Sequence, residues 1–118
     1  MAEFSQFTIT DAAFDVASRF VEEKWFETVK DTGIFAAAYV IRCHFGDVDP
    51  GELYFPGSSH NVSYATYDPD GSWEALIRTL YQTDTPRAYF RNLVIFGLEK
   101  MGKKIQESGT IQITDFLS

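Results

Sequence analysis

Three side chains in the chain are of the types used in nucleophilic catalysis. Cys43 and His44 are adjacent, and His60 follows further along. A cysteine becomes a nucleophile when its thiolate is stabilised and the fold places a base beside it. No motif in the sequence organises such a pair, and cysteine is commonly a buried residue. We therefore predict no catalytic residue and a protein that is not an enzyme.

Metal binding is a second chemistry that these residue types allow. Acidic residues and histidines are scattered from His44 to Asp70, and carboxylate oxygens suit Ca²⁺. Their spacing is not that of an EF-hand, and residues 68–71 are typical of a turn. The sequence also lacks a phosphate-binding glycine loop and a dinucleotide-binding motif. We predict no metal and no cofactor; a small-ligand binder or an enzyme using the loop region 46–71 remains an alternative.

Nucleic-acid binding would require basic side chains, and the chain is acidic overall. It has 118 residues and a net charge of −7. Most of the negative charge lies in residues 1–59, so an anionic partner is expected to meet residues 60–118. The nucleic-acid candidates there are Arg78, Arg87 and Arg91, of which the last two share a helical face. Direct contact with nucleic acid is possible but disfavoured by the net charge.

The amino-terminal residues suggest another way to contact DNA. An alternating segment at residues 6–10 precedes two helical patterns, which resembles the plan of ribbon-helix-helix proteins. In that plan two chains pair their strands and direct polar side chains into a DNA groove. The outward candidates are Gln6, Thr8 and Thr10. A ribbon-helix-helix-like DNA-binding protein is therefore the second functional hypothesis.

Large apolar side chains are the strongest indication of an interaction surface in the sequence. Aromatic residues make up 16% of the chain, and tyrosine and tryptophan are enriched at protein interfaces. One group of candidates lies in or after a loop rich in proline and glycine, and the other lies on the second face of the last helix. The partner-binding candidates are Leu53, Tyr54, Phe55, Trp73, Tyr89, Leu93 and Phe96.

These candidates must be positioned by a predominantly helical α+β fold. Helical spacing predicts about four helices, which start near Thr10, Thr28, Ser72 and Pro86. Short strands are expected at residues 6–10, 61–67 and 110–115, and one long central loop at residues 46–60. The two terminal strands are expected to pair, either within one chain or between two. The length of the chain indicates a single domain over residues 1–118.

Two apolar segments resemble a known protein family. Residues 32–40 contain Gly33-Ile34-Phe35 after Thr32 and continue as an alanine-rich helix, and residues 93–101 contain Gly97-Leu98-Glu99. Both segments resemble small accessory proteins of bacterial DNA-phosphorothioation (Dnd-type) defence systems. The resemblance covers about sixty residues. It implies a non-enzymatic component of a DNA-related complex, possibly concerned with phage defence.

Composition also indicates where the protein acts. With Cys43 as its one cysteine, the sequence can form no intramolecular disulfide, which suits a reducing compartment. No signal-peptide pattern and no run of about 18 apolar residues is present. We expect a cytoplasmic protein that does not enter a membrane. The leading hypothesis is a small accessory protein that binds itself, as a homo-oligomer, and another protein.

Overall fold

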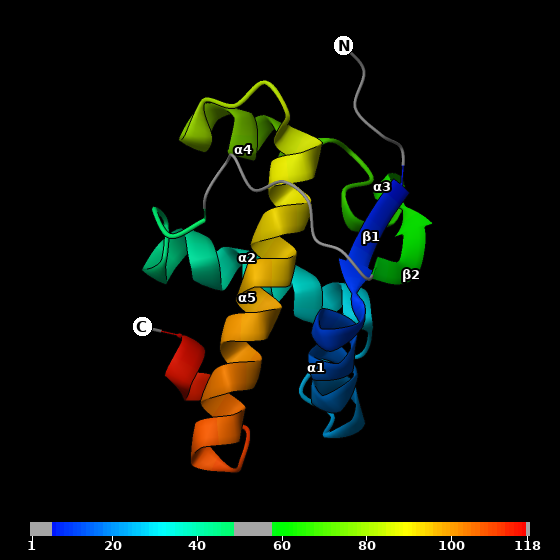
Figure 1. Ribbon diagram of the computed structural model, residues 1–118. Helices are drawn as coiled ribbons and strands as arrows, with labels where there is room; N and C mark the ends of the chain where they lie inside the picture. The colour runs from blue at the N-terminus through cyan, green and yellow to red at the C-terminus, as the bar shows by residue number, and fades with distance from the viewer. Residues whose placement is uncertain (1–5, 49–57, 118) are drawn as a thin grey trace.

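A computed structural model describes residues 6–48 and 58–117 of the chain (Figure 1). The described part is predominantly helical with one two-stranded sheet, as the sequence predicts. In chain order its elements are β1 (Gln6–Thr10), α1 (Asp11–Glu22), α2 (Val29–Cys43), β2 (Ser58–Ser63), α3 (Tyr64–Tyr67), α4 (Ser72–Tyr81), α5 (Pro86–Ser108) and a 3₁₀ helix, η1 (Ile113–Phe116).

Helix α5 is the axis around which the other elements pack. Helix α2 crosses it, α1 lies beside its carboxyl-terminal half, and α4 lies near its amino-terminal end (Figure 1). Phe90, Leu93, Val94 and Leu98 of α5 are fully buried. The buried apolar side chains of all these elements form one hydrophobic cluster.

Local signals determine where the main helices begin and end. The Thr10 hydroxyl accepts a hydrogen bond from the Ala13 amide at 3.1 Å, and Thr28 does the same for Asp31. Pro86 occupies the first turn of α5, where its missing N–H costs nothing. Gly109 ends α5 with a left-handed backbone (φ 81°), a conformation that glycine adopts without strain.

The sheet differs from the expected pairing of the two chain ends. Strand β1 pairs antiparallel with β2 of the same chain, with Phe7 opposite Val62 and Ile9 opposite His60. Strand β2 therefore begins before the predicted residue 61, and residues 64–67 form a short helix instead of its continuation.

The predicted strand at residues 110–115 is wrong. This segment contains the buried Ile111 and the first residues of η1, which ends at the buried Phe116. The Phe116 ring packs edge-on against Tyr39, with ring centroids 5.3 Å apart, and its carbonyl accepts a hydrogen bond from Arg42. The alternation of Ile111 and Ile113 is typical of a strand. The contacts of Phe116 with α2 instead hold this segment in a helical turn.

The expected long central loop lies largely outside the described residues, at 49–57. Within the described part of the chain, no helix has the length and apolar character needed to cross a membrane.

Candidate interaction surface

The predicted partner-binding residues fall into different environments. Leu53, Tyr54 and Phe55 lie outside the described residues. Tyr89 and Leu93 are buried in the core, so they do not form an exposed second face of α5. The reason is that the amino-terminal half of α5 is covered on several sides, and the Tyr89 hydroxyl donates to the Val48 carbonyl at 3.1 Å.

Of the four candidates within the described residues, Trp73 and Phe96 keep partial exposure. The Trp73 indole stacks on the buried Phe90 ring, with centroids 5.0 Å apart, and so serves mainly to attach α4 to α5. Phe96 is half-buried and lines a groove between α1 and α5. It is the predicted partner residue that the structure places on a recessed surface.

This groove, called the α1–α5 groove below, has a volume of about 610 Å³. Its floor is apolar and its rim is polar or charged. The residues lining it are Ala12, Val16, Arg19, Phe96, Glu99, Lys100, Gly102, Lys103 and Gln106.

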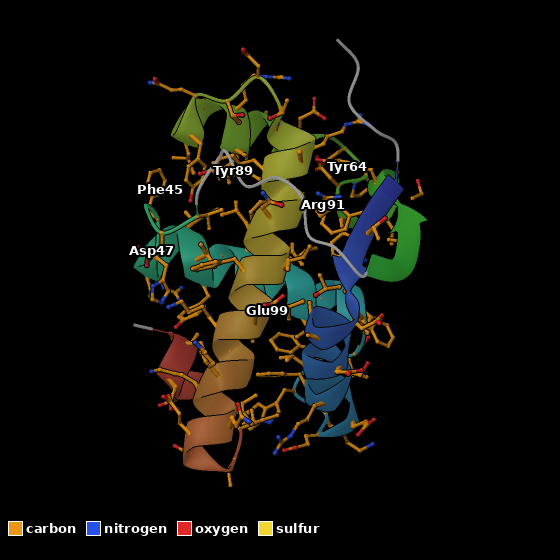
Figure 2. The ribbon with its side chains drawn as sticks, in the orientation of Figure 1. Phe45, Asp47, Tyr64, Tyr89, Arg91 and Glu99 are labelled. Carbon is orange, nitrogen blue, oxygen red and sulfur yellow. The ribbon has the colours of Figure 1, made fainter. Side chains whose placement is uncertain are left out.

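The close approach of α1 to α5 forms the floor of the groove. A Cβ added at Gly102 would lie 2.6 Å from a methyl carbon of Val16, so glycine allows the two helices to meet. At the amino-terminal end of α1, the Thr10 hydroxyl donates to the Glu99 carboxylate at 3.3 Å, and Glu99 faces the start of α1 (Figure 2). These two contacts hold α1 and α5 side by side.

The rim charges differ in whether they are paired within the chain. Arg19 forms an ion pair with Glu23 at 3.1 Å, and Glu99 accepts from Thr10. Lys100 lies over the Phe96 ring, 5.5 Å from its centroid. Among the described residues, no ion pair includes Lys100 or Lys103. On the α5 side of the groove, Lys103 is exposed and Lys100 is partly buried.

A second apolar surface lies on α4. Leu76 and Leu80 are one turn apart and 43% and 39% exposed, whereas Ile77 between them is fully buried. The apolar side chains of α4 therefore extend around the helix beyond the face that packs against α5. These leucines lie in the region, Leu53 to Tyr81, where the sequence predicts a partner.

The predicted strand contacts to DNA have other roles in this fold. Thr10 is buried and caps α1, and Thr8 is half-buried. Gln6 lies opposite Ser63 in the sheet. Because β1 pairs with β2 of its own chain, the paired ribbon of two chains expected for a ribbon-helix-helix protein is not the arrangement seen.

The three candidate arginines lie near the amino-terminal part of α5 and on α4. Arg78 and Arg87 both form ion pairs with Glu74, at 3.5 and 3.0 Å. Arg87 also lies over the Tyr64 ring, 4.5 Å from its centroid. Arg91 is half-buried, and burial lowers the pKa of its guanidinium group (Figure 2). Arg87 and Arg91 are therefore partly covered, whereas Arg78 stays exposed beside Glu74.

His44 belongs to a chain of polar contacts at the end of α2. Its Nδ1 lies 2.9 Å from a carboxylate oxygen of Asp47, and its Nε2 lies 3.1 Å from the Tyr39 hydroxyl. Burial raises the pKa of Tyr39. Tyr39 and His44, together with Cys43 and lysines of α5, line a second groove of about 530 Å³.

The two histidines lie on different elements of the described fold. His60 lies in β2, opposite Ile9, and so belongs to a different part of the fold from His44. No cluster of three or more potential metal ligands occurs in residues 6–48 and 58–117. The Asp68 carboxylate, a former metal candidate, instead accepts hydrogen bonds from Tyr64, Trp73 and Glu74.

Comparison with known proteins finds no family model that matches the chain, and no match among curated proteins or solved structures.

Sequence reasoning missed most of the groove. Ala12, Val16 and Gly102 carry no functional signal by type, because their importance depends on α1 lying beside α5. One usable sign is the glycine at position 102 within a helical pattern, which often has a packing reason.

Proposed function

We propose that the chain is a small, non-catalytic accessory protein that acts as a homo-oligomer and also contacts another protein. The observation that carries this proposal is the α1–α5 groove. An apolar floor with an aromatic side chain, surrounded by polar and charged residues, is the usual anatomy of a protein interface. The leucines of α4 supply a separate apolar surface for the second protein.

We place this protein in the cytoplasm and in a DNA-related complex, possibly one of phage defence. Support for the complex comes from the resemblance to Dnd-type accessory proteins, and support for the compartment comes from the single cysteine. Direct DNA binding is the weaker alternative. A net charge of −7, a capping role for Thr10 and arginines paired with Glu74 all count against it.

The mass of the protein in solution tests the proposal. Gel filtration with light scattering at micromolar concentration is expected to give a multiple of the 13.4 kDa chain mass. A protein that stays monomeric throughout that range would overturn the homo-oligomer. In a parallel mobility-shift assay at low salt we expect no shift of duplex DNA, and a salt-dependent shift would favour the DNA-binding alternative instead.

A further inference from the structure

A small cavity lies where the two strands and α3 meet α1 and the first turn of α2 (Figure 1). Its volume is about 120 Å³. Three of the residues that line it, Phe7, Ile9 and Tyr67, are buried, whereas the others are partly or fully exposed. The buried residues therefore form the inner wall, and the exposed ones form a mouth that opens to solvent. We call this space the sheet cavity.

The inner wall of the sheet cavity is apolar and is held in place by the core. The fully buried Phe7 ring stacks on the Tyr67 ring, with centroids 4.0 Å apart. It also packs edge-on against the Phe90 ring of α5, with centroids 5.4 Å apart. Rings packed in this way cannot move far without disturbing the core. The cavity is therefore preformed, as is usual for small-molecule sites.

The mouth of the sheet cavity combines apolar side chains with two polar ones. Phe14 and Val29 are half-buried, and Val62 is 39% exposed opposite Phe7 in the sheet. The polar side chains are those of Lys30, which is half-buried, and Thr66, which is exposed. Among the described residues that line the cavity, Lys30 carries the only charge.

The Lys30 ammonium group is available to a ligand. No ion pair within residues 6–48 and 58–117 includes it. Its acidic neighbours in sequence, Glu27 and Asp31, line a separate groove beside Trp25. A half-buried lysine lays its methylene groups along apolar surface and keeps its ammonium group in water. An anion at the mouth would therefore meet a cation that has no partner within the described part of the chain.

We propose that the sheet cavity binds a small aromatic carboxylate, with its ring inside the cavity and its carboxylate at the mouth beside Lys30. Apolar cavities of about 150 Å³ stay dry and bind benzene, so the volume suits a single ring. A ring also packs favourably against the edges and faces of Phe7, Phe14 and Tyr67. The carboxylate must stay outside, because an apolar wall cannot solvate its charge. The inference does not depend on the proposed oligomer.

Phenylacetate and its neutral analogue phenylethanol test the proposal, because they share the ring and differ in charge. NMR titration of methyl-labelled protein should give a dissociation constant below about 1 mM for phenylacetate. Phenylethanol should bind about three- to tenfold more weakly. Ring protons of both ligands should show nuclear Overhauser contacts to the methyl groups of Ile9, Val29 and Val62. An ionic strength of about 1 M should weaken phenylacetate binding more than phenylethanol binding.

Matched variants separate the charge of Lys30 from the apolar cavity. K30M removes the ammonium group and keeps a flexible apolar side chain, so phenylacetate should lose its advantage while phenylethanol binds as before. K104M is the control, because Lys104 is exposed and does not line the cavity; it should leave both affinities unchanged. V62F fills the mouth with an aromatic residue that a strand accommodates. It should weaken both ligands at least about tenfold, with circular dichroism to check its fold.

Each result either supports or overturns the assignment. Failure of both ligands to bind the wild type, or contacts to methyl groups outside the cavity, would overturn the site. Equal affinities of phenylacetate and phenylethanol would overturn the carboxylate as the recognised group. Equal effects of K30M and K104M would overturn the role of Lys30. These measurements do not depend on the mass of the protein in solution, so a failure here leaves the proposed oligomer standing.

Discussion

The backbone of Gly97 in α5 lies directly against the carbonyl group of Ala36 in α2. A Cβ added at position 97 would lie 2.8 Å from the Ala36 carbonyl carbon and 2.9 Å from its Cβ. Both atoms belong to a buried part of α2 and have no room to move aside. The crossing of the two helices therefore depends on a glycine at position 97 (Figure 1).

We expect G97A to lower the free energy of unfolding by about 2–3 kcal/mol, because the added methyl group must push the helices apart. This loss should appear although alanine is the better helix former by about 1 kcal/mol. G102A should cost less, because its methyl group meets only the side chain of Val16. Urea denaturation measures all of these differences.

Gly46 provides the matched control for these two variants. It is exposed, and no atom of residues 6–48 and 58–117 lies within 4 Å of an added Cβ, so G46A should change stability by only a few tenths of a kcal/mol. Equal stabilities of G97A and G46A would contradict the close approach at Ala36.

A second prediction concerns the buried carboxylate of Asp68, which holds the start of α4. It accepts hydrogen bonds from the Tyr64 hydroxyl at 2.8 Å and from the amides of Trp73 and Glu74 at 3.0 Å. In D68N an NH₂ group replaces one of the accepting oxygens. We expect a loss of about 1–3 kcal/mol in thermal or urea unfolding, with faster hydrogen exchange at those two amides.

The neighbouring Asp70 serves as a comparison for D68N. It is exposed, and its carboxylate accepts a hydrogen bond from the Ser72 amide at 3.1 Å. D70N should therefore cost clearly less than D68N. The reverse order would show that the capping of α4 does not depend on Asp68.

The parts of the fold that could be predicted from sequence depend on local interactions. Thr10 and Thr28 cap helices because their hydroxyls reach amides three residues on, and Pro86 and Gly109 bound α5 through their own backbone preferences. None of these signals requires knowledge of a distant residue.

The errors come from interactions between distant residues. The strand pattern of residues 6–10 was correct, but its partner β2 is remote in sequence, and alternation alone does not choose between candidate partners. A glycine within a helical pattern does not indicate which group will lie against it. Gly33 lies against the side chains of Tyr67 and Val94, whereas the close approach to a backbone occurs at Gly97.

In the candidate site, too, local patterns are predicted correctly and contacts between distant residues are not. The two-sided apolar pattern of α5 grouped Phe96, which is half-buried and lines the α1–α5 groove, with Tyr89 and Leu93, which are buried in the core. Periodicity indicates which residues share a helix face. It does not indicate how far along the helix that face is covered by other elements.

A third prediction separates the structural role of Thr10 from its proposed contact with DNA. Its hydroxyl accepts from the Ala13 amide and donates to Glu99. T10V should lower the free energy of unfolding by about 1–2 kcal/mol through loss of the cap, whereas T10S keeps the hydroxyl and should stay close to wild type. If both variants have the same urea unfolding midpoint as the wild type, the Thr10 cap contributes nothing to stability.

A fourth prediction follows from the tyrosines of the core. Burial raises the pKa of Tyr67 to about 12, above the value of about 10 expected in the unfolded chain. Between these two values the native protein retains the phenol proton and the unfolded chain releases it. The contribution of Tyr67 to the free energy of unfolding should therefore be fully present below pH 10. As the pH rises above 10, the free energy of unfolding should fall by up to about 1.4 kcal/mol per pH unit because of this residue.

The variant Y67F tests this assignment because it removes the titrating group and keeps the ring that stacks on Phe7, with centroids 4.0 Å apart. Its stability should decline less steeply than that of the wild type between pH 10 and 12, and should match the wild type's pH dependence below pH 9. Some alkaline loss should persist, since burial also raises the pKa of Tyr81 to about 12. Urea denaturation at stepped pH gives both slopes; identical slopes would mean that Tyr67 ionises as readily in the folded protein as in the unfolded chain.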